Sequence, residues 1–232
     1  MLICGLNKTT LLDYPEHVAA TIFTGGCNFC CPFCHNGDLV LRPSTVAPYS
    51  EEEIFSFLQK RRSVLSGVCI TGGEPTLQPD LREFILKVKA LGLLVKLDTN
   101  GYRPDVFIPL CEEGLIDYVA MDIKNTPAKY AETAGVISFF DFSNIEKSVQ
   151  YLLHGTIPCE FRTTVVKELH TFEDLSAIAV WLQGCSHYYI QSYKETEQII
   201  APGFSAYPNE ILKGYVEQLQ SILPVVSLRG ID

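Results

Sequence analysis

The chain has 232 residues, of which 47% are hydrophobic and 19% charged, and its formal net charge is −9. This length suffices for one domain with its own core, and the composition excludes a disordered, fibrous or collagen-like chain. The acidity disfavours a nucleic-acid partner, because a sequence-independent nucleic-acid binder needs a basic face. No run approaches the roughly 18 apolar residues of a membrane span. The first residues also lack the pattern of a secretory signal, so we expect a cytoplasmic protein with no membrane partner.

Along the chain, short β-rich runs alternate with segments of helical periodicity. Ser50 and Thr171 are the expected N-caps of two of the helices. We expect strands at 18–24, 67–71, 93–97, 118–123, 160–166 and 187–191, with a short one at 225–228, and helices at 51–62, 79–91, 104–113, 143–154, 172–182 and 208–223.

Six β-α units in sequence predict an α/β fold with a parallel sheet and right-handed crossovers. A complete eight-stranded barrel needs about 250 residues, so six units in this length favour a partial (β/α)6 barrel. We expect a single domain over 1–232, with a hairpin or extension at 1–16, the barrel core at 17–193 and a C-terminal extension at 194–232.

Polar and ligand-capable residues follow each expected strand. Parallel sheets place their chemistry at the carboxyl ends of the strands, so the whole set predicts one composite pocket. The tracts are Gly25-Gly26-Cys27, Gly72-Gly73-Glu74, Asp98-Thr99-Asn100, Asp122-Ile123-Lys124, Arg162-Thr163-Thr164 and Gln191-Ser192-Tyr193.

Nine cysteines are present, and four of them, Cys27, Cys30, Cys31 and Cys34, lie within eight residues. In a reducing compartment, such clustering indicates metal binding or catalysis rather than disulfides. Cys27, Cys31 and Cys34 could ligate three irons of a [4Fe–4S] cluster and leave the fourth iron open, as in reactive metal sites. Cys30 could compete with Cys31. The expected role of the remaining cysteines is packing as small hydrophobes; these are Cys4, Cys69, Cys111, Cys159 and Cys185.

Three other readings of this loop are open. Two CxxC pairs could form a zinc site, although such pairs are usually separated by a longer loop. Cys31 to His35 also matches the CxxCH attachment signature of c-type haem, a chemistry associated with export. A thioredoxin-like CxxC would stand at a helix N-terminus after a strand, and the extra cysteines argue against it.

The motif Cys27-x3-Cys31-x2-Cys34 follows a strand, has Phe33 before its third cysteine, and precedes a Gly72-Gly73-Glu74 tract after the next strand. This combination resembles the radical S-adenosylmethionine (SAM) superfamily. A narrower resemblance covers roughly residues 3 to 195 through the segments DYP, FTGGCNFCCPFCHN, LDTNG and MDIK. These resemble the activating enzymes of glycyl radical enzymes, above all the longer form of the anaerobic ribonucleoside-triphosphate reductase activating proteins, with pyruvate formate-lyase activating enzyme a near relative. Cys30 departs from that pattern. The chain lacks a second group of clustered cysteines, so an auxiliary iron–sulfur cluster is not expected.

The resemblance implies a radical SAM oxidoreductase. In such enzymes the open iron binds the amino and carboxylate groups of SAM, and an electron from the cluster cleaves SAM to methionine and a 5′-deoxyadenosyl radical. That radical would abstract hydrogen from a glycine of a partner glycyl radical enzyme, here anaerobic ribonucleoside-triphosphate reductase. A flavodoxin or ferredoxin would supply the electron.

The resemblance also implies roles for single residues. Gly72 and Gly73 would allow close backbone approach, and Glu74 would accept a hydrogen bond from the methionine ammonium. In the pyruvate formate-lyase relative, the aspartates that match Asp98 and Asp122 help to bind a monovalent cation beside SAM. The other expected SAM-site residues are Phe33, Asn100, Lys124 and Arg162.

Structural roles for these residues remain open. The glycines could form a plain tight turn, the aspartates could cap loops, and Phe33 could serve packing alone. Lys124 could contact SAM or lie at the surface, and Arg162 could point into the pocket or form an ion pair. His35 could hydrogen-bond near the cluster or lie in solvent.

Two other functions compete with the activase. A radical SAM enzyme could act on a small molecule or RNA, although the acidity disfavours RNA and a C-terminal lid would be short. A non-enzymatic iron–sulfur or zinc protein would leave the GGEPT, LDTNG and MDIK segments unexplained.

Overall fold

The computed structural model describes residues 1–136, 139–196 and 198–231. Their strands form one sheet in which the hydrogen-bonded order follows the chain from β1 to β8. This α/β architecture confirms the predicted fold class, and each expected strand and helix is present with small differences at its ends. The strands are β1 (Ile3–Thr10), β2 (Ala19–Thr24), β3 (Gly67–Gly72), β4 (Leu94–Thr99), β5 (Tyr118–Asp122), β6 (Cys159–Val165), β7 (Tyr188–Ser192) and β8 (Val226–Arg229).

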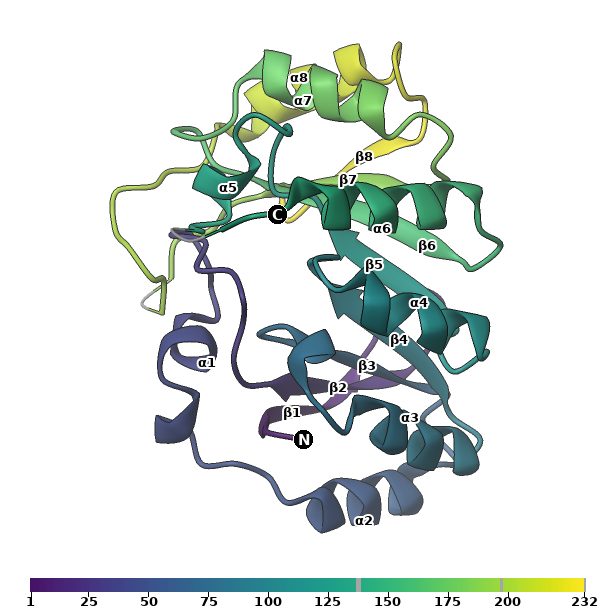
Figure 1. Ribbon diagram of the computed structural model, residues 1–232. Coiled ribbons are helices and arrows are strands. Elements are labelled where there is room, and N and C mark those ends of the chain that lie inside the picture. The colour runs from purple at the N-terminus through teal and green to yellow at the C-terminus, as the bar shows by residue number, and fades with distance from the viewer. Residues whose placement is uncertain (137–138, 197, 232) are drawn as a thin grey trace. The chain divides into compact units, whose positions relative to one another are not determined.

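The helices follow the strands as expected, and two short ones, α1 and α5, were not predicted (Figure 1). The α-helices of the described residues are α1 (Gly37–Leu41), α2 (Glu51–Arg61), α3 (Leu81–Ala90), α4 (Pro104–Glu112), α5 (Tyr130–Thr133), α6 (Phe142–His154), α7 (Phe172–Trp181) and α8 (Asn209–Leu219). Single turns of 3-10 helix lie at Pro43–Thr45 and Pro75–Leu77.

The chain divides into two compact units, each with its own core. We call Met1–Asn28 with Asp38–Ala120 the first unit, and Phe29–Gly37 with Met121–Asp232 the second unit. The division falls at neither of the boundaries expected at 16/17 and 193/194, and the single-domain assignment stays a prediction.

In the first unit, β1 pairs antiparallel with β2, and β2, β3 and β4 pair in parallel. Ile22, Ile70 and Leu97 on these strands are fully buried. Helix α3 packs its buried face against β4, beside which it runs in Figure 1. Ser50 caps α2 as predicted, because its side chain accepts from the Glu53 amide in a capping box.

The Asp13-Tyr14 pair closes the amino end of β2 and β3 in the first unit. Tyr14 is 2% exposed and lies against Gly67, where an added Cβ would stand 2.8 Å from the ring. Asp13 Oδ2 accepts a hydrogen bond from Thr21 Oγ1 at 2.5 Å. This segment, whose role the sequence left unassigned, packs at the end of the strands opposite to their carboxyl ends.

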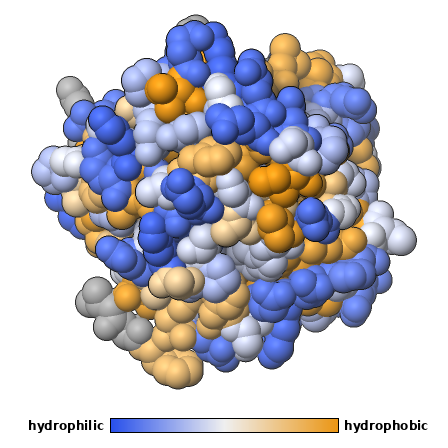
Figure 2. All heavy atoms as spheres, turned by 90° about the horizontal axis from the view of Figure 1, so that it is seen from above, coloured by the Kyte–Doolittle hydropathy of each residue, from blue (hydrophilic) through white to orange (hydrophobic). Residues whose placement is uncertain are grey.

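In the second unit, β6, β7 and β8 pair in parallel, and α7 and α8 lie side by side (Figure 1). Thr171 caps α7 as expected, through a capping box with Asp174. Figure 2 looks onto the side of these helices, where hydrophilic and hydrophobic residues are interspersed. Their exposed apolar residues include Val180 and Ile211, and scattered residues of this kind are normal on a surface.

No helix in the described part of the chain combines the length and hydrophobicity that a membrane span requires.

Candidate functional site

The two glycines after β3 let two backbone segments of the first unit touch. The Gly73 amide donates to Thr24 O and the Glu74 amide donates to Gly26 O, both at 2.8 Å. A Cβ on Gly73 would stand 1.9 Å from Gly26 O, and one on Gly72, at φ +111°, would stand 2.4 Å from Thr24 N. The close approach that requires glycine is therefore to the chain's own backbone, immediately before Cys27.

Glu74 ties the end of β3 to the end of β4. Its side chain is buried, and its carboxylate accepts from Thr76 N (3.1 Å), Thr76 Oγ1 (2.5 Å), Thr99 Oγ1 (2.8 Å) and Asn100 N (2.7 Å). Burial raises the pKa of Glu74, and these hydrogen bonds act against that rise. A carboxylate has about four acceptor sites, so the donors within the chain occupy this one. The expected contact with a SAM ammonium stays a prediction.

Asn100 contacts the first cysteine of the loop. Its Nδ2 lies 3.8 Å from Cys27 Sγ and donates to Asn28 Oδ1 at 2.9 Å. The Nδ2 of Asn28 is buried and has no hydrogen-bond partner. Buried donors are normally satisfied, so an orphaned N–H beside Cys27 suits an acceptor such as the sulfur of a bound cluster. Asn28 was not predicted from sequence, although its place next to Cys27 was the available signal.

Asp98, the second-last residue of β4, is paired with a buried lysine. Lys96 is 1% exposed, and its Nζ donates to Asp98 Oδ1. Cys69 Sγ approaches the same oxygen at 3.6 Å. Only a packing role was expected for Cys69, and Lys96 was not predicted as a site residue because nothing in the sequence distinguishes it from other strand residues.

The second unit carries the rest of the cysteine loop. The Cys30 amide donates to Ala134 O at 2.9 Å. Gly135, at φ +64°, lies so close that an added Cβ would stand 2.0 Å from Cys30 O. The backbone of Cys30 is therefore fixed against the turn that follows α5.

Burial also affects the thiol pKa values of Cys31 and Cys34. It raises the pKa of the Cys31 thiol to about 11, against the opposing charge of Lys124, and it also raises the pKa of Cys34. The thiolate is the form that ligates metal, so a cluster must displace a proton at both positions. Lys124 favours that displacement at Cys31, and this donor set suits iron–sulfur ligation.

The described residues hold no group of three or more His, Cys, Asp or Glu side chains placed around a single metal ion. All nine cysteines are free thiols.

Phe33 is 5% exposed and is surrounded by rings. His170, Tyr193 and Phe204 lie edge-on to it, with centroids at 6.4, 6.5 and 6.4 Å. This environment supports the packing role, and the adenine contact stays a prediction.

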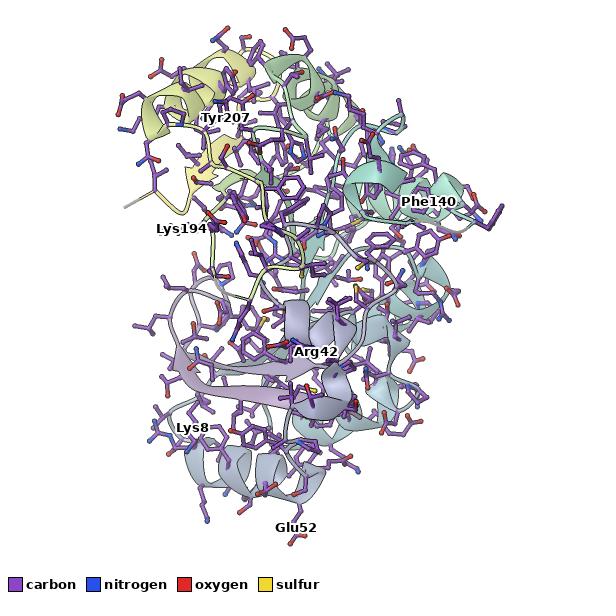
Figure 3. The ribbon with its side chains drawn as sticks, turned by 90° about the vertical axis from the view of Figure 1, so that its left-hand side faces the viewer. Lys8, Arg42, Glu52, Phe140, Lys194 and Tyr207 are labelled. Carbon is purple, nitrogen blue, oxygen red and sulfur yellow. The ribbon has the colours of Figure 1, made fainter. Side chains whose placement is uncertain are left out.

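A segment that we call the strap, residues 198–207, holds this part of the loop. The Ala201 amide donates to Pro32 O at 2.9 Å, and the Gly37 amide donates to Gln198 O at 3.1 Å. Tyr207 Oη donates to His170 O at 2.9 Å. Figure 3 labels Tyr207 at one end of this segment and Lys194 before its other end. His35 stacks on Tyr193, with ring centroids 5.5 Å apart, and its Nε2 lies 2.5 Å from Lys194 O.

The last expected residues form a charge network in the second unit. Asp122 Oδ1 accepts from Arg162 Nε at 2.9 Å, and Oδ2 accepts from Lys124 Nζ at 3.0 Å. Burial opposes ionisation of Asp122, but these two cations outweigh it and hold its pKa at about 2. Lys124 and Arg162 are therefore both ion-paired, with side chains 18% and 14% exposed.

The network continues to β8. Glu160 is 1% exposed, and its carboxylate accepts from Arg229 Nη1 and Nη2 at 2.9 and 3.0 Å. Arg162 Nη1 lies 3.9 Å from Glu160 Oε1. The guanidinium of Arg229 also covers the Tyr189 ring at 3.2 Å. Neither Glu160 nor Arg229 was identified from sequence, because their pairing is separated by 69 residues.

Each unit thus gathers part of the expected set at the carboxyl ends of its own strands. The first unit holds Cys27, Gly72, Gly73, Glu74, Asp98 and Asn100, and the second holds Cys31, Phe33, Cys34, Asp122, Lys124 and Arg162.

Comparison with known proteins identifies the family to which the chain belongs. Residues 21–179 match the model of the Radical SAM superfamily. The chain is 36% identical over 199 residues to "Putative glycyl-radical enzyme activating enzyme MJ1227" of Methanocaldococcus jannaschii, covering 83% of this chain and 80% of that protein. It is 29% identical over 153 residues to pyruvate formate-lyase-activating enzyme of Listeria monocytogenes, covering 59% and 61%.

The crystal structure of Streptococcus suis SuiB bound to S-adenosylmethionine has a similar fold, with a TM-score of 0.70 and 16% identity. The alignment covers 89% of this chain and 49% of SuiB, so the chain spans about half the length of that protein. The family match and the Methanocaldococcus relative show that this chain belongs to the radical SAM superfamily, among the glycyl-radical enzyme activating enzymes.

Proposed function

We propose that the chain uses a [4Fe–4S] cluster and SAM to activate a glycyl radical enzyme, with anaerobic ribonucleoside-triphosphate reductase as the partner. The observation that carries the proposal is the 36% identity to an activating enzyme of which the chain covers 80%. When bound, the cluster and SAM would supply the radical that removes hydrogen from a partner glycine. A flavodoxin or ferredoxin would be the electron donor.

Cys27, Cys31 and Cys34 would hold three irons of the cluster. Thiolates are the usual ligands of such clusters, and the three residues lie within eight positions of the chain. Each thiolate would ligate a different iron, so the three sulfurs need not converge on one point. The Asn100 amide would donate toward Cys27 Sγ, and Lys124 would favour the thiolate at Cys31.

The charge network of the second unit suits the carboxylate of SAM. Lys124, Arg162 and Arg229 carry three positive charges against the two negative charges of Asp122 and Glu160. A surplus of one positive charge in a largely buried network favours an anionic group. Lys124, the lysine of the MDIK segment, is our choice for that contact.

The test is anaerobic reconstitution with iron and sulfide, followed by SAM and a strong reductant, with 5′-deoxyadenosine as the product assayed. We expect product from the wild type and from Cys30→Ala, and none from Cys31→Ala. Because Cys30 and Cys31 are adjacent, Cys30→Ala is the matched control. A loaded cluster that yields no 5′-deoxyadenosine would refute radical SAM activity.

The partner is tested by mixing the loaded protein, SAM and reductant with anaerobic ribonucleoside-triphosphate reductase under exclusion of oxygen. We expect the electron paramagnetic resonance doublet of a glycyl radical. A doublet with pyruvate formate-lyase alone would reassign the partner and keep the activase function.

A further inference from the structure

The aspartates that would bind a monovalent cation are already paired with cations of the chain. Asp98 Oδ1 accepts from Lys96 Nζ, and Asp122 accepts from Arg162 and Lys124, one on each oxygen. These pairs form within each unit separately. A carboxylate that already has a cationic partner gains less from another cation, because the two positive charges repel. The residues present therefore do not fit an alkali-metal site.

Lys96 is buried within the first unit, where its ammonium group contacts Asp98. It stands opposite Cys69 in the parallel register of β3 and β4, and its side chain is 2% exposed. Its Nζ lies 4.0 Å from Cys69 Sγ and 5.9 Å from the centroid of the Tyr118 ring, over the ring face. An isolated buried ammonium is costly, and pairing with a carboxylate is what makes it tolerable. The small Cys69 side chain leaves room for the lysine to bend toward Asp98.

Lys96 and Asp98 lie on the same side of β4, because side chains two residues apart on a strand point to the same face. The pair places the ammonium just before the carboxyl end of the strand, where Thr99 and Asn100 contact Glu74. An ammonium group resembles a potassium ion in charge and approximate size, and oxygen atoms bind both.

We propose that Lys96 supplies the positive charge at Asp98 that an alkali-metal ion would otherwise provide, so that the SAM site of this chain works without such an ion. Lys96 is in this sense a positioning residue, which holds the Asp98 carboxylate in place through their ion pair. The proposal rests on the proposed SAM-binding function for its consequence, but the absence of an alkali ion at Asp98 can be tested without SAM.

The first test uses the protein without cluster or SAM, crystallised and soaked in rubidium chloride. We expect no anomalous rubidium peak at Asp98 or Asp122 in the wild type. In Lys96→Ala, which removes the ammonium and opens its space, we expect a peak at Asp98. A rubidium peak at Asp98 in the wild type would overturn the proposal, and this result stands even if the variant does not fold.

The second test measures SAM affinity of the cluster-loaded protein in potassium chloride and in tetramethylammonium chloride at equal ionic strength. For the wild type, we expect the same SAM affinity in both salts. The same holds for Lys87→Ala, a surface control at a lysine whose side chain is 58% exposed. Lys96→Ala should bind SAM about tenfold more weakly without potassium, a loss of one strong polar contact, and should recover with it. Lys96→Met should lose affinity in both salts, because its side chain fills the space.

A wild type that binds SAM only with potassium would refute the role of Lys96. A wild type that binds no SAM in either salt would refute the proposed function instead, and the rubidium experiment would then decide the cation question alone. A merely structural role of Lys96 predicts lost stability in Lys96→Ala without any acquired dependence on potassium.

Discussion

The side-chain amide of Asn100, just past the end of β4, lies 3.8 Å from the sulfur of Cys27, which follows β2. The two residues are 73 positions apart in the chain. Hydrogen bonds to the sulfurs tune the reduction potential of an iron–sulfur cluster. This contact therefore connects a strand-end amide to the redox chemistry that we propose for the loop.

Asn100→Asp keeps the size of the side chain but replaces the donor with a negative charge. We expect the reduction potential of the loaded cluster to become more negative by an amount on the order of tens of millivolts, because the reduced cluster loses a stabilising contact. A redox titration followed by electron paramagnetic resonance measures this. Asn7→Asp, on β1, is the matched surface control, and equal potentials in wild type and Asn100→Asp would contradict the prediction.

Gly73→Ala should destabilise the first unit, because the added Cβ would stand 1.9 Å from Gly26 O. This neighbour is a backbone atom, which cannot move aside as the end of a flexible side chain could. We expect a loss of about 3 kcal/mol or more in the free energy of unfolding, the upper range for overpacking. Urea unfolding of the protein without cluster measures it. Gly214→Ala is the control, since it lies within α8 with open space around its Cβ, and it should raise stability by about 0.5–1 kcal/mol. Wild-type stability of Gly73→Ala would show that the loops can separate freely.

His170 should make stability depend on pH below neutrality. It is fully buried, its Nδ1 accepts from the Val166 amide at 3.1 Å, and its Nε2 donates to Lys124 O at 2.7 Å. Burial lowers the pKa of His170 below its usual 6.5, so the folded state binds its proton less readily than the unfolded chain. The contribution is complete above pH 6.5 and is lost as pH falls through the folded-state pKa.

Unfolding by urea between pH 5 and pH 8, compared for wild type and His170→Gln, measures this contribution. The wild type should lose more stability on acidification than the variant. His154→Gln, at the exposed end of α6, should behave like the wild type. Parallel curves for wild type and His170→Gln would show that His170 carries no such linkage.

Arg229→Met should destabilise the second unit, because it leaves the buried Glu160 carboxylate without its bidentate partner. Breaking a buried ion pair from one side costs about 3 kcal/mol or more. The double variant Glu160→Gln/Arg229→Met should regain most of this loss, since no unpaired charge remains. Chemical denaturation of the wild type, the two single variants Glu160→Gln and Arg229→Met, and the double variant gives the comparison, and additive losses in the double variant would argue against the pair.

Much of the architecture follows from local pattern. The apolar runs of β3 and β4 and the helical periodicity of α2 and α3 predict these elements, because burial of an apolar face decides secondary structure at short range. The N-caps Ser50 and Thr171 were correct for the same reason, since capping involves only residues three positions apart. The short helix α5 was missed because four residues carry no detectable period.

The chemistry of the loop was also readable from sequence, since Cys27, Cys31 and Cys34 lie within eight residues and the glycine–glutamate tract follows the next strand. The partners of these residues were not. Whether Asp98 meets a metal ion or an ammonium depends on Lys96 bending past Cys69, and whether Arg162 is paired depends on Asp122 forty residues away. Local pattern determined which residues stand at the strand ends, and only the tertiary structure decided which charges neutralise one another, because Coulomb energies depend on distance in space rather than along the chain.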